Sequence, residues 1–98
     1  MEVQFIDPDL GRLETDAGFD GGYPQEAVRG FRKVMQVVRA AVDERDLYAM
    51  KSLHFEKLKG DRKDERSLRL NKQWRLIVKM ISATPKNVVA ILKIEDYH

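Results

Sequence analysis

The longest periodic pattern in the chain lies between residues 24 and 41. Its apolar positions recur at steps of three and four residues, at Val28, Phe31, Met35, Val38 and Val42. Cationic side chains stand between them, at Arg29, Arg32, Lys33 and Arg39. This spacing gathers the apolar residues on one face of a helix. Pro24 suits the first turn, because its fixed φ fits a helix and its missing N–H has no partner there. The pattern predicts one amphipathic helix over residues 24–41.

Weaker signals precede this helix. Val3 and Phe5 alternate with polar residues, which predicts a short strand that ends at Asp7 and Pro8. The stretch DAGFDGGYP, residues 16–24, contains the glycines and the proline typical of a loop. The N-terminal part therefore predicts one strand and then an irregular connection.

A second, shorter helix is predicted directly after the first. Asp43 is a suitable N-cap residue, because its carboxylate can accept hydrogen bonds from the free N–H groups of the first helical turn. The predicted helix covers residues 44–52, with Leu47 and Met50 facing inward.

After Ser52 the pattern favours strands. In residues 53–58, Leu53, Phe55 and Lys57 would share one face of an extended segment, while His54, Glu56 and Leu58 would share the other. Three further segments are alternating or rich in β-branched residues: SLRLN at 67–71, WRLIVKMIS at 74–82 and VVAILKI at 88–94. Short connections between consecutive strands indicate antiparallel pairing.

These elements predict an α+β fold. Its N-terminal strand and two helices would pack on one face of a mainly antiparallel four- to five-stranded sheet. A chain of 98 residues is too short for two ordinary cores, so residues 1–98 are expected to form a single domain.

Composition adds information mainly through the distribution of charge. The net charge is only +2, yet residues 1–23 carry −5 and residues 51–79 carry +6. A small domain with this asymmetry can attract polyanions, of which nucleic acids are the commonest in cells. A solvated surface is the simpler interpretation of any one charge run. There is no apolar run of the roughly 20 residues that a membrane span needs and no export signal, so a cytoplasmic location is the default expectation.

The candidate chemistry comes from the cations rather than from metal ligands. Two histidines and no cysteine argue against a structural zinc site, and His54 is most simply a partly buried strand residue. Glu95 and Asp96 are adjacent on a predicted strand, so their side chains diverge and are expected to be surface or end-of-strand residues. A tight hairpin through residues 71–73 would put Arg69 and Arg75 on neighbouring strands, with Lys59 beside them. Leu68, Leu70 and Leu76 would then face the helices, which leaves the arginine pair and Lys59 in an exposed patch on the open face of the sheet. Arginine binds phosphate oxygens in a bidentate manner, and lysine supplies a mobile charge.

Three motifs also resemble a known family. LKGDR at 58–62, SLRLN-x-QWRL at 67–76 and EDYH at 95–98 are similar in sequence and order to the HigB toxins of the RelE/ParE superfamily. The resemblance implies a RelE-like fold and a toxin of a type II toxin–antitoxin system. HigB-like toxins are endoribonucleases, or mRNA interferases, that cut messenger RNA in the ribosomal A site and inhibit translation. It further implies no metal and no other cofactor, attack by the 2′-OH on the adjacent phosphorus, and three partners: the 70S ribosome, mRNA and a helix-turn-helix, HigA-like antitoxin.

The resemblance also implies roles for individual residues. Lys59 would contact the scissile phosphate, Arg75 would stabilise its developing charge, and Tyr97 and His98 fall on the family's C-terminal functional residues. His98 is the best acid or base candidate, because an unperturbed imidazole titrates near a pKa of about 6.5. The expected contacts to RNA or the ribosome are Lys57, Arg62, Lys63, Arg66, Arg69 and Lys72.

Two assignments stay open. Some family members carry a histidine three positions before the motif lysine, where this chain has Glu56. His54 lies two residues upstream on the same predicted face, so the general base is open: it is His54, Glu56 or neither of them. Trp74 can stack on a base, although a tryptophan that begins a strand is more often a core residue.

Two other functions fit the same predicted fold. The first is a non-catalytic inhibitor of DNA gyrase, like the ParE branch of the superfamily, since one scaffold hosts both activities. The second is a decayed toxin that still binds RNA or ribosomes without cleaving. The lysine, the arginine and the terminal Tyr-His pair favour the nuclease.

Overall fold

The computed structural model describes residues 1–82 and 87–96 and confirms the α+β class. In chain order the elements are β1 (Glu2–Phe5), α1 (Pro8–Thr15), α2 (Gln25–Ala40), α3 (Glu44–Ala49), the 3₁₀ turn η1 (Lys51–Leu53), β2 (Glu56–Lys57), the 3₁₀ turn η2 (Gly60–Arg62), β3 (Glu65–Arg69), β4 (Trp74–Ser82) and β5 (Asn87–Asp96). The predicted first strand and the long helix are present at nearly the predicted positions. None of the helices in the described ranges is long and apolar enough to cross a membrane.

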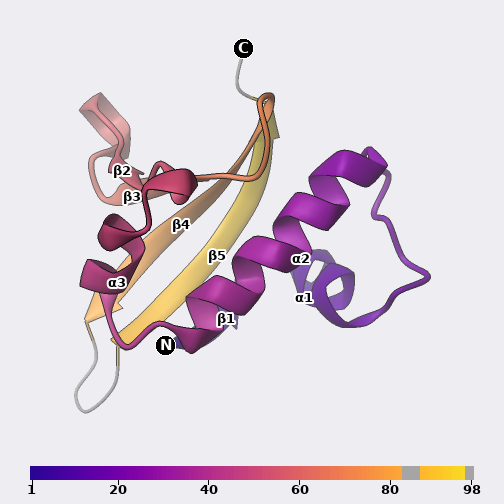
Figure 1. Ribbon diagram of the computed structural model, residues 1–98, viewed down its shortest axis with the longest axis horizontal. Coiled ribbons are helices and arrows are strands. Elements are labelled where there is room, and N and C mark those ends of the chain that lie inside the picture. Colours follow the sequence, from indigo (N-terminus) through magenta and orange to yellow (C-terminus); the bar gives the residue numbers. More distant parts are fainter. Residues whose placement is uncertain (83–86, 97–98) are drawn as a thin grey trace.

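The strands form one mixed sheet in the order β1-β5-β4-β3-β2. Strands β2 to β5 pair antiparallel as predicted, whereas β1 pairs parallel to β5. Helices α2 and α3 lie over the same face of β4 and β5 (Figure 1). The turn between β3 and β4 and the end of β5 lie together at the top of Figure 1, so residues distant in sequence meet at one end of the sheet.

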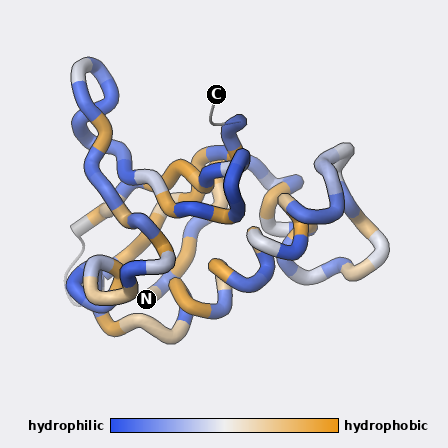
Figure 2. Tube along the Cα trace, turned by 45° about the horizontal axis from the view of Figure 1, so that its top comes forward, coloured by the Kyte–Doolittle hydropathy of each residue, from blue (hydrophilic) through white to orange (hydrophobic). Residues whose placement is uncertain are grey.

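The core lies between α2 and the sheet. Phe31, Met35 and Val38 of α2 are fully buried, because the apolar stripe predicted from the sequence faces Leu76 and Val78 of β4. Each such side chain contributes about 1.5–3 kcal/mol relative to an exposed position. In contrast, Figure 2 shows that the arm formed by β2 and η2 is mostly hydrophilic. The arm therefore does not belong to the helix-covered core.

Helix α1 was not predicted. Asp7 caps it by accepting from the Asp9 N–H at 3.0 Å, and Pro8 stands in its first turn, so the Asp-Pro pair that ends β1 also begins a helix. Leu10 and Leu13 are its only buried residues in the structure as described. Two apolar positions and a glycine in eight residues give too little periodicity for a prediction from the sequence.

The region after α2 differs from prediction in three ways. The second helix ends at Ala49, and a 3₁₀ turn follows, so Met50 is 44% exposed instead of buried. Val42 follows the end of α2 and is 77% exposed. Residues 53–57 do not form a strand along their length: only Glu56 and Lys57 pair with β3. The alternation in this stretch comes from a turn that buries Leu53 and Phe55.

Candidate nucleic-acid interface

The end of the sheet at the β3–β4 turn gathers cations from separate strands. Arg69 and Arg75 are direct cross-strand partners, and so are Leu68 and Leu76 one position further in. The two leucines are fully buried against the helices. Because neighbouring positions along a strand point to opposite faces, both arginines lie on the face away from α2. The predicted arrangement of this arginine pair is confirmed.

Arg75 lies deeper than expected. Its other cross-strand partner is Glu95 of β5, so Arg75 lies on a central strand between Arg69 and Glu95. Only 9% of the residue is exposed, and its Nε and Nη1 atoms are buried. The expectation that Arg75 belongs to an exposed patch is therefore wrong. A guanidinium on a central strand is shielded by its neighbours on both sides.

Arg62 joins three parts of this face. Its Nη1 and Nη2 donate to the two carboxylate oxygens of Glu95 at 3.2 and 3.0 Å, and its Nε donates to Glu65 at 3.1 Å. Lys93 lies 3.2 Å from the same Glu95 carboxylate. The hydrogen bonds from Arg62, and then those from Lys93, lower the pKa of Glu95, and the bond to Glu95 raises the pKa of Arg62. Both groups are therefore charged near neutral pH.

The position of these partners shows what Arg62 covers. Glu65 is opposite Lys79 on β4 and Glu95 is opposite Arg75, so a side chain that binds both crosses β4 between those positions. Ile77 lies there on the same face, and it is 1% exposed although it is outside the core under the helices. We infer that Arg62 shields Ile77 and fixes the 60–62 turn over this face.

Lys59 does not lie beside the arginine pair in the strand ladder. The Leu58 N–H donates to the Glu65 carbonyl at 3.1 Å, so the exposed Lys59 follows the Glu65 end of β3. Arg69 is at the other end of that strand, and four extended residues span about 13 Å. Arg62, three residues after Lys59, connects this turn with Glu95. The structure thus brings Arg62, Arg69 and Arg75 to one face and leaves Lys59 at its margin.

The two candidate bases are separated. His54 is exposed, has left-handed backbone dihedrals (φ 47°) and lies with Nε2 3.3 Å from Nη1 of Arg69. It is therefore neither buried nor in a strand, which corrects that prediction. Glu56 is opposite Ser67, two positions further from the arginine pair. Positive φ is uncommon for residues other than glycine, and such strain is often found at functional positions.

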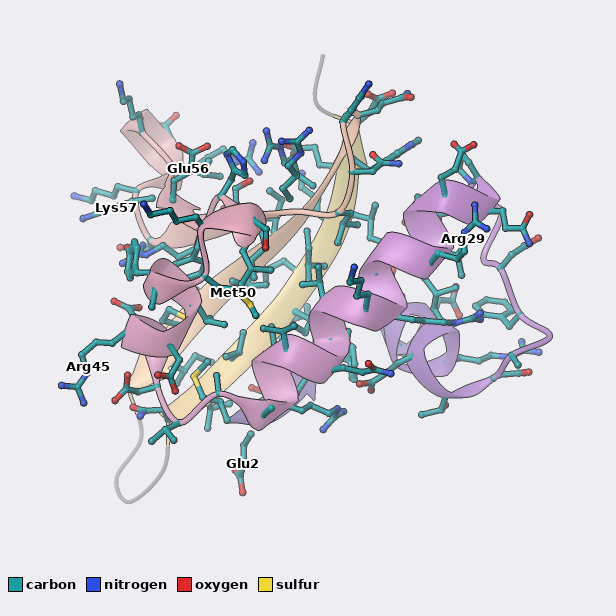
Figure 3. All side chains as sticks on the ribbon, viewed as in Figure 1. Glu2, Arg29, Arg45, Met50, Glu56 and Lys57 are labelled. Atoms are coloured by element: carbon teal, nitrogen blue, oxygen red, sulfur yellow. The ribbon has the colours of Figure 1, made fainter. Side chains whose placement is uncertain are left out.

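The remaining cations do not share one face. Lys57 is opposite Arg66, which lies on the same side of β3 as Leu68, so both are on the helix side of the sheet at its outer edge. Figure 3 shows Lys57 and Glu56 on the protruding arm. Lys63 is exposed beyond η2, and Lys72 is exposed in the turn between β3 and β4. These side chains lie around the arginine cluster, which consists of Arg62, Arg69 and Arg75, and do not belong to it.

Trp74 is on the opposite face from Arg75. Its ring meets that of Tyr23 edge to face, with centroids 6.1 Å apart, and it packs partly buried against the core. The core interpretation of Trp74 is therefore the better one. Tyr97 and His98 lie outside the described residues. Asp96, just before them, accepts a hydrogen bond from Gln73 Nε2 at 3.0 Å.

The acidic partners were missed in the sequence. Glu95 was expected to be a surface or end-of-strand residue, yet it is opposite Arg75 and accepts from Arg62. Among residues 1–82 and 87–96, no three His, Cys, Asp or Glu side chains form a group suited to hold a metal ion.

Comparisons with known proteins agree with this architecture. Residues 4–98 match the family described as RelE-like toxin of type II toxin–antitoxin system HigB. No curated protein matches the sequence. The fold is similar to that of YafQ from E. coli strain BL21(DE3), with a TM-score of 0.59 and 13% identity over 97% of this chain and 91% of that chain. It is also similar to the YoeB/ParE toxin from Agrobacterium tumefaciens, with a TM-score of 0.56 and 14% identity over 100% of both chains.

Proposed function

Since the chain belongs to the HigB-like family of RelE-like toxins of type II toxin–antitoxin systems, we propose that it is a ribosome-dependent endoribonuclease that cleaves mRNA in the A site. The family match over residues 4–98 carries this proposal. Support comes from the end of the sheet, where Arg69 and Arg75 are cross-strand partners and Arg75 is also opposite Glu95 of β5. Cleavage of translated mRNA inhibits translation and takes place in the cytoplasm, where ribosomes work.

The reaction makes three demands on the side chains. The 2′-OH attacks the adjacent phosphorus and the P–O5′ bond breaks, which leaves a 2′,3′-cyclic phosphate and a 5′-OH end. One group must take the proton of the 2′-OH, another must give a proton to the leaving 5′-oxygen, and fixed positive charge must stabilise the crowded phosphorus. Arg75 is assigned to the charge, and His98 with Tyr97 to proton transfer. No step requires a metal ion.

The general base remains His54 or Glu56, and the geometry favours His54. Its Nε2 is within 3.3 Å of Arg69, the direct neighbour of Arg75, whereas Glu56 is level with Ser67. A base must lie within hydrogen-bond reach of the proton that it takes. Lys59, at the margin of the face, is assigned to the phosphate chain close to the scissile bond.

Arg62 has a different role from the one first expected. Its guanidinium is already bound to two carboxylates, so it has little capacity left for RNA. We assign it to positioning: it holds the turn that carries Lys59 against β5, whose continuation carries the terminal residues. Lys57, Lys63, Arg66 and Lys72 surround the cluster and are assigned to contacts with mRNA and the 70S ribosome. A HigA-like helix-turn-helix antitoxin is the proposed inhibitor.

A reconstituted translation reaction tests the proposal. The 5′ ends of a defined mRNA are mapped after addition of toxin, with and without ribosomes. Cuts within codons that appear only with ribosomes are the expected result, and Arg75→Ala should reduce them by roughly 10²–10³-fold. Arg45→Ala is the matched control, since Arg45 is 89% exposed on α3, far from the arm (Figure 3). Circular dichroism checks that both variants fold.

Other outcomes point to other functions. Equal cleavage of naked mRNA would contradict ribosome dependence. Inhibition of gyrase supercoiling without any RNA cleavage would identify the ParE-like, non-catalytic branch. Ribosome binding with neither activity would identify a decayed toxin.

A further inference from the structure

The turn between β3 and β4 is braced by one of its own side chains. Oδ1 of Asn71 accepts hydrogen bonds from the backbone N–H groups of Gln73 and Trp74, at 2.9 and 2.8 Å. The Leu70 N–H donates to the Trp74 carbonyl at 2.9 Å and closes the turn. Asparagine side chains commonly fix tight turns by accepting from the backbone two residues on. The backbone of Gln73 is therefore held in a defined position.

The side chain of Gln73 is bound to the end of β5. Its Nε2 donates to Oδ2 of Asp96 at 3.0 Å, and the two residues are 23 positions apart in the sequence. Lys72, the preceding residue of the turn, is exposed instead. A hydrogen bond to a carboxylate is stronger than one between two neutral groups. The turn thus presents Lys72 to solvent and directs Gln73 to β5.

The end of β5 has a neighbouring strand on one side only. In the described part of the chain, β1 pairs with β5 no further than Ile91, whereas β4 pairs with it as far as Asp96. Trp74 is the first residue of β4 and lies opposite Asp96, so the strand ladder ends at this pair. The last residues of β5 therefore depend on β4 and on side-chain contacts.

Side chains hold this end of β5 on both faces of the sheet. Glu95 is bound by Arg62 on the face of the arginine pair. Asp96 is opposite Trp74, which packs against the core, so Asp96 belongs to the helix-covered face, and there it is bound by Gln73. Loss of one bond leaves the other intact, so the role of Gln73 can be separated from that of Arg62.

The same turn also holds the arginine pair. Nε of Arg69 donates to the Asn71 carbonyl at 3.3 Å, and Arg69 is the cross-strand partner of Arg75. One short segment therefore contacts both the arginines and the last described residue of β5. A misplacement of about 1 Å can cost an enzyme on the order of 10²-fold in rate, so a fixed distance between these groups matters for catalysis.

We propose that Gln73 is a positioning residue for RNA cleavage. Through Asp96 it fixes the end of β5, from which Tyr97 and His98 follow in the sequence, relative to the arginine pair. The proposal rests on the proposed function, which assigns proton transfer to Tyr97 and His98. Gln73 acts through Asp96 and does not touch the RNA.

Gln73→Met tests this role, because methionine has a similar length and cannot donate the hydrogen bond. With mRNA on 70S ribosomes as the substrate, we expect kcat to fall by about tenfold or more and KM to stay within about twofold. The set of codons that are cut should not change.

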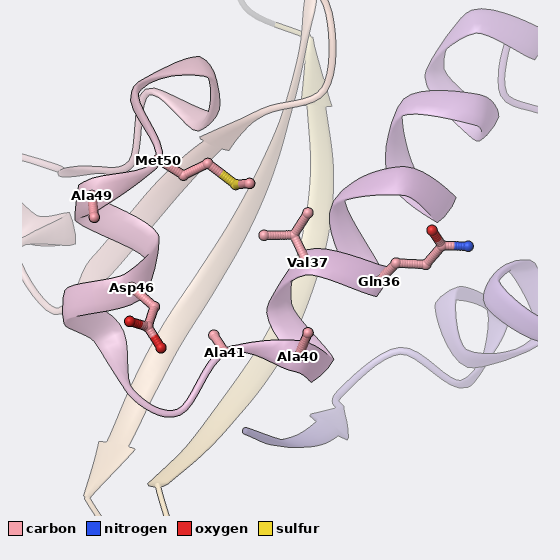
Figure 4. Close-up of a pocket in the computed structure, with 7 residues that line it drawn as sticks. All are labelled: Gln36, Val37, Ala40, Ala41, Asp46, Ala49 and Met50. Carbon is pink, nitrogen blue, oxygen red and sulfur yellow. The ribbon is translucent and has the colours of Figure 1, made fainter.

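Gln36→Met is the matched control. Gln36 is exposed on α2 (Figure 4). It lies six residues, or about 9 Å, along the helix from Gly30, where a Cβ would meet Leu70 at the start of the turn. This variant should keep the wild-type kcat and KM.

Amide hydrogen exchange measures the contact without an activity assay. Gln73→Met should speed exchange at residues 94–96 by about fivefold or more, because a local opening at the end of β5 becomes easier. Residues 88–91 pair with both β1 and β4 and should exchange at the wild-type rate.

An exchange of the two side chains tests the pair itself. Gln73→Glu places two carboxylates together, so it should cleave more slowly than Gln73→Met. Adding Asp96→Asn restores a hydrogen bond with donor and acceptor reversed. The double variant should therefore exceed Gln73→Glu in kcat by about fivefold or more and regain slow amide exchange.

Four results would overturn the proposal. They are unchanged exchange at residues 94–96 in Gln73→Met, a double variant no faster than Gln73→Glu, an equal loss of kcat in Gln36→Met, and a change of KM or of the codons cut without a change of kcat. The last would show that Gln73 contacts RNA directly. A wild-type protein that cleaves no mRNA would contradict the proposed function and a catalytic role for Gln73, whereas faster exchange in Gln73→Met would still establish that Gln73 holds the end of β5.

Discussion

The ion pair between Arg62 and Glu95 provides the sharpest test of how the candidate site is held. The pair is bidentate, and the two side chains are 37% and 30% exposed. Exposed pairs contribute about 0–1 kcal/mol, and hydrogen bonds between charged groups that are partly shielded contribute about 1.5–3 kcal/mol. We therefore expect a coupling energy of about 1–2 kcal/mol from a double-mutant cycle with Arg62→Ala and Glu95→Ala.

The chain contains a matched control pair. Arg45 and Asp43 also make a close contact, at 2.8 Å, but Arg45 is 89% exposed. Solvent screens this pair, so its coupling energy should stay below about 0.5 kcal/mol. Urea unfolding measures both cycles. With a slope of about 1–3 kcal/mol per molar, a loss of about 1.5 kcal/mol shifts the midpoint by roughly 0.5–1.5 M.

Activity separates positioning from binding of RNA. If Arg62 positions the Lys59 turn, Arg62→Ala lowers kcat at temperatures where the variant is folded and leaves KM and its salt dependence unchanged. If Arg62 contacts phosphate, KM rises and the slope of affinity against salt falls by about one unit. Coupling energies that are equal in the two pairs, or an effect confined to KM, would refute the positioning role.

Three further predictions concern stability and catalysis. Gly30→Ala should destabilise the fold by more than about 1 kcal/mol, measured by thermal unfolding, because a Cβ there would lie 2.5 Å from the Leu70 carbonyl oxygen; Gly18→Ala, with its nearest atom at 3.5 Å, should have little effect. The lowered pKa of Glu95 contributes stability that is present above pH 4.5, the ordinary value, and is lost as pH falls through the lower folded pKa, so Glu95→Gln should flatten the acid limb of a stability–pH curve. Arg75→Lys should keep the fold and still lose at least tenfold in cleavage rate, because a flexible ammonium does not reproduce the planar guanidinium that the neighbouring strands hold in place; full activity of this variant would contradict a specific role for Arg75.

The parts of the fold that could be predicted are those whose hydrophobic pattern is long or strictly alternating. The stripe on α2 predicts residues 24–41, and the helix runs from Gln25 to Ala40. The hairpin between β3 and β4 is also predictable, because its short turn fixes the register of Arg69 and Arg75. The parallel pairing of β1 with β5 joins the two ends of the chain, and no local pattern carries that information.

The stretch before β2 shows why alternation alone can mislead. Leu53 and Phe55 are both buried, as in a half-buried strand, yet Lys51–Leu53 forms a 3₁₀ turn and His54 adopts a left-handed conformation. A turn of this kind returns every second side chain to the core and leaves the intervening one outside. The error matters, because it placed His54 in a strand beside Glu56 instead of next to Arg69.

A β-bulge explains why the acidic half of the site was not predictable. At the end of β4 and the start of β5 the register pairs Ser82 with Asn87 and Val78 with Ile91, and extending it unbroken would put Arg75 opposite Ile94. The register shifts between Ile77 and Val78, so Arg75 is opposite Glu95 instead. Because β5 has one extra residue at this point, the neighbour of Arg75 on β5 is the carboxylate of Glu95 and not the apolar side chain of Ile94.

That shift has a consequence for catalysis. Three guanidiniums, from Arg62, Arg69 and Arg75, share one face, and without the carboxylates of Glu65 and Glu95 their mutual repulsion would favour a disordered arrangement. The two carboxylates bind Arg62, and the face keeps a net positive charge. The side chains that carry this charge are fixed in position by the strands and by these ion pairs. Charge fixed before the substrate arrives needs little reorganisation in the transition state. Replacing both acidic partners, Glu65→Gln with Glu95→Gln, should therefore strongly reduce cleavage while the helix-side core remains, and a double variant that cleaves at the wild-type rate would show that the acidic partners are dispensable.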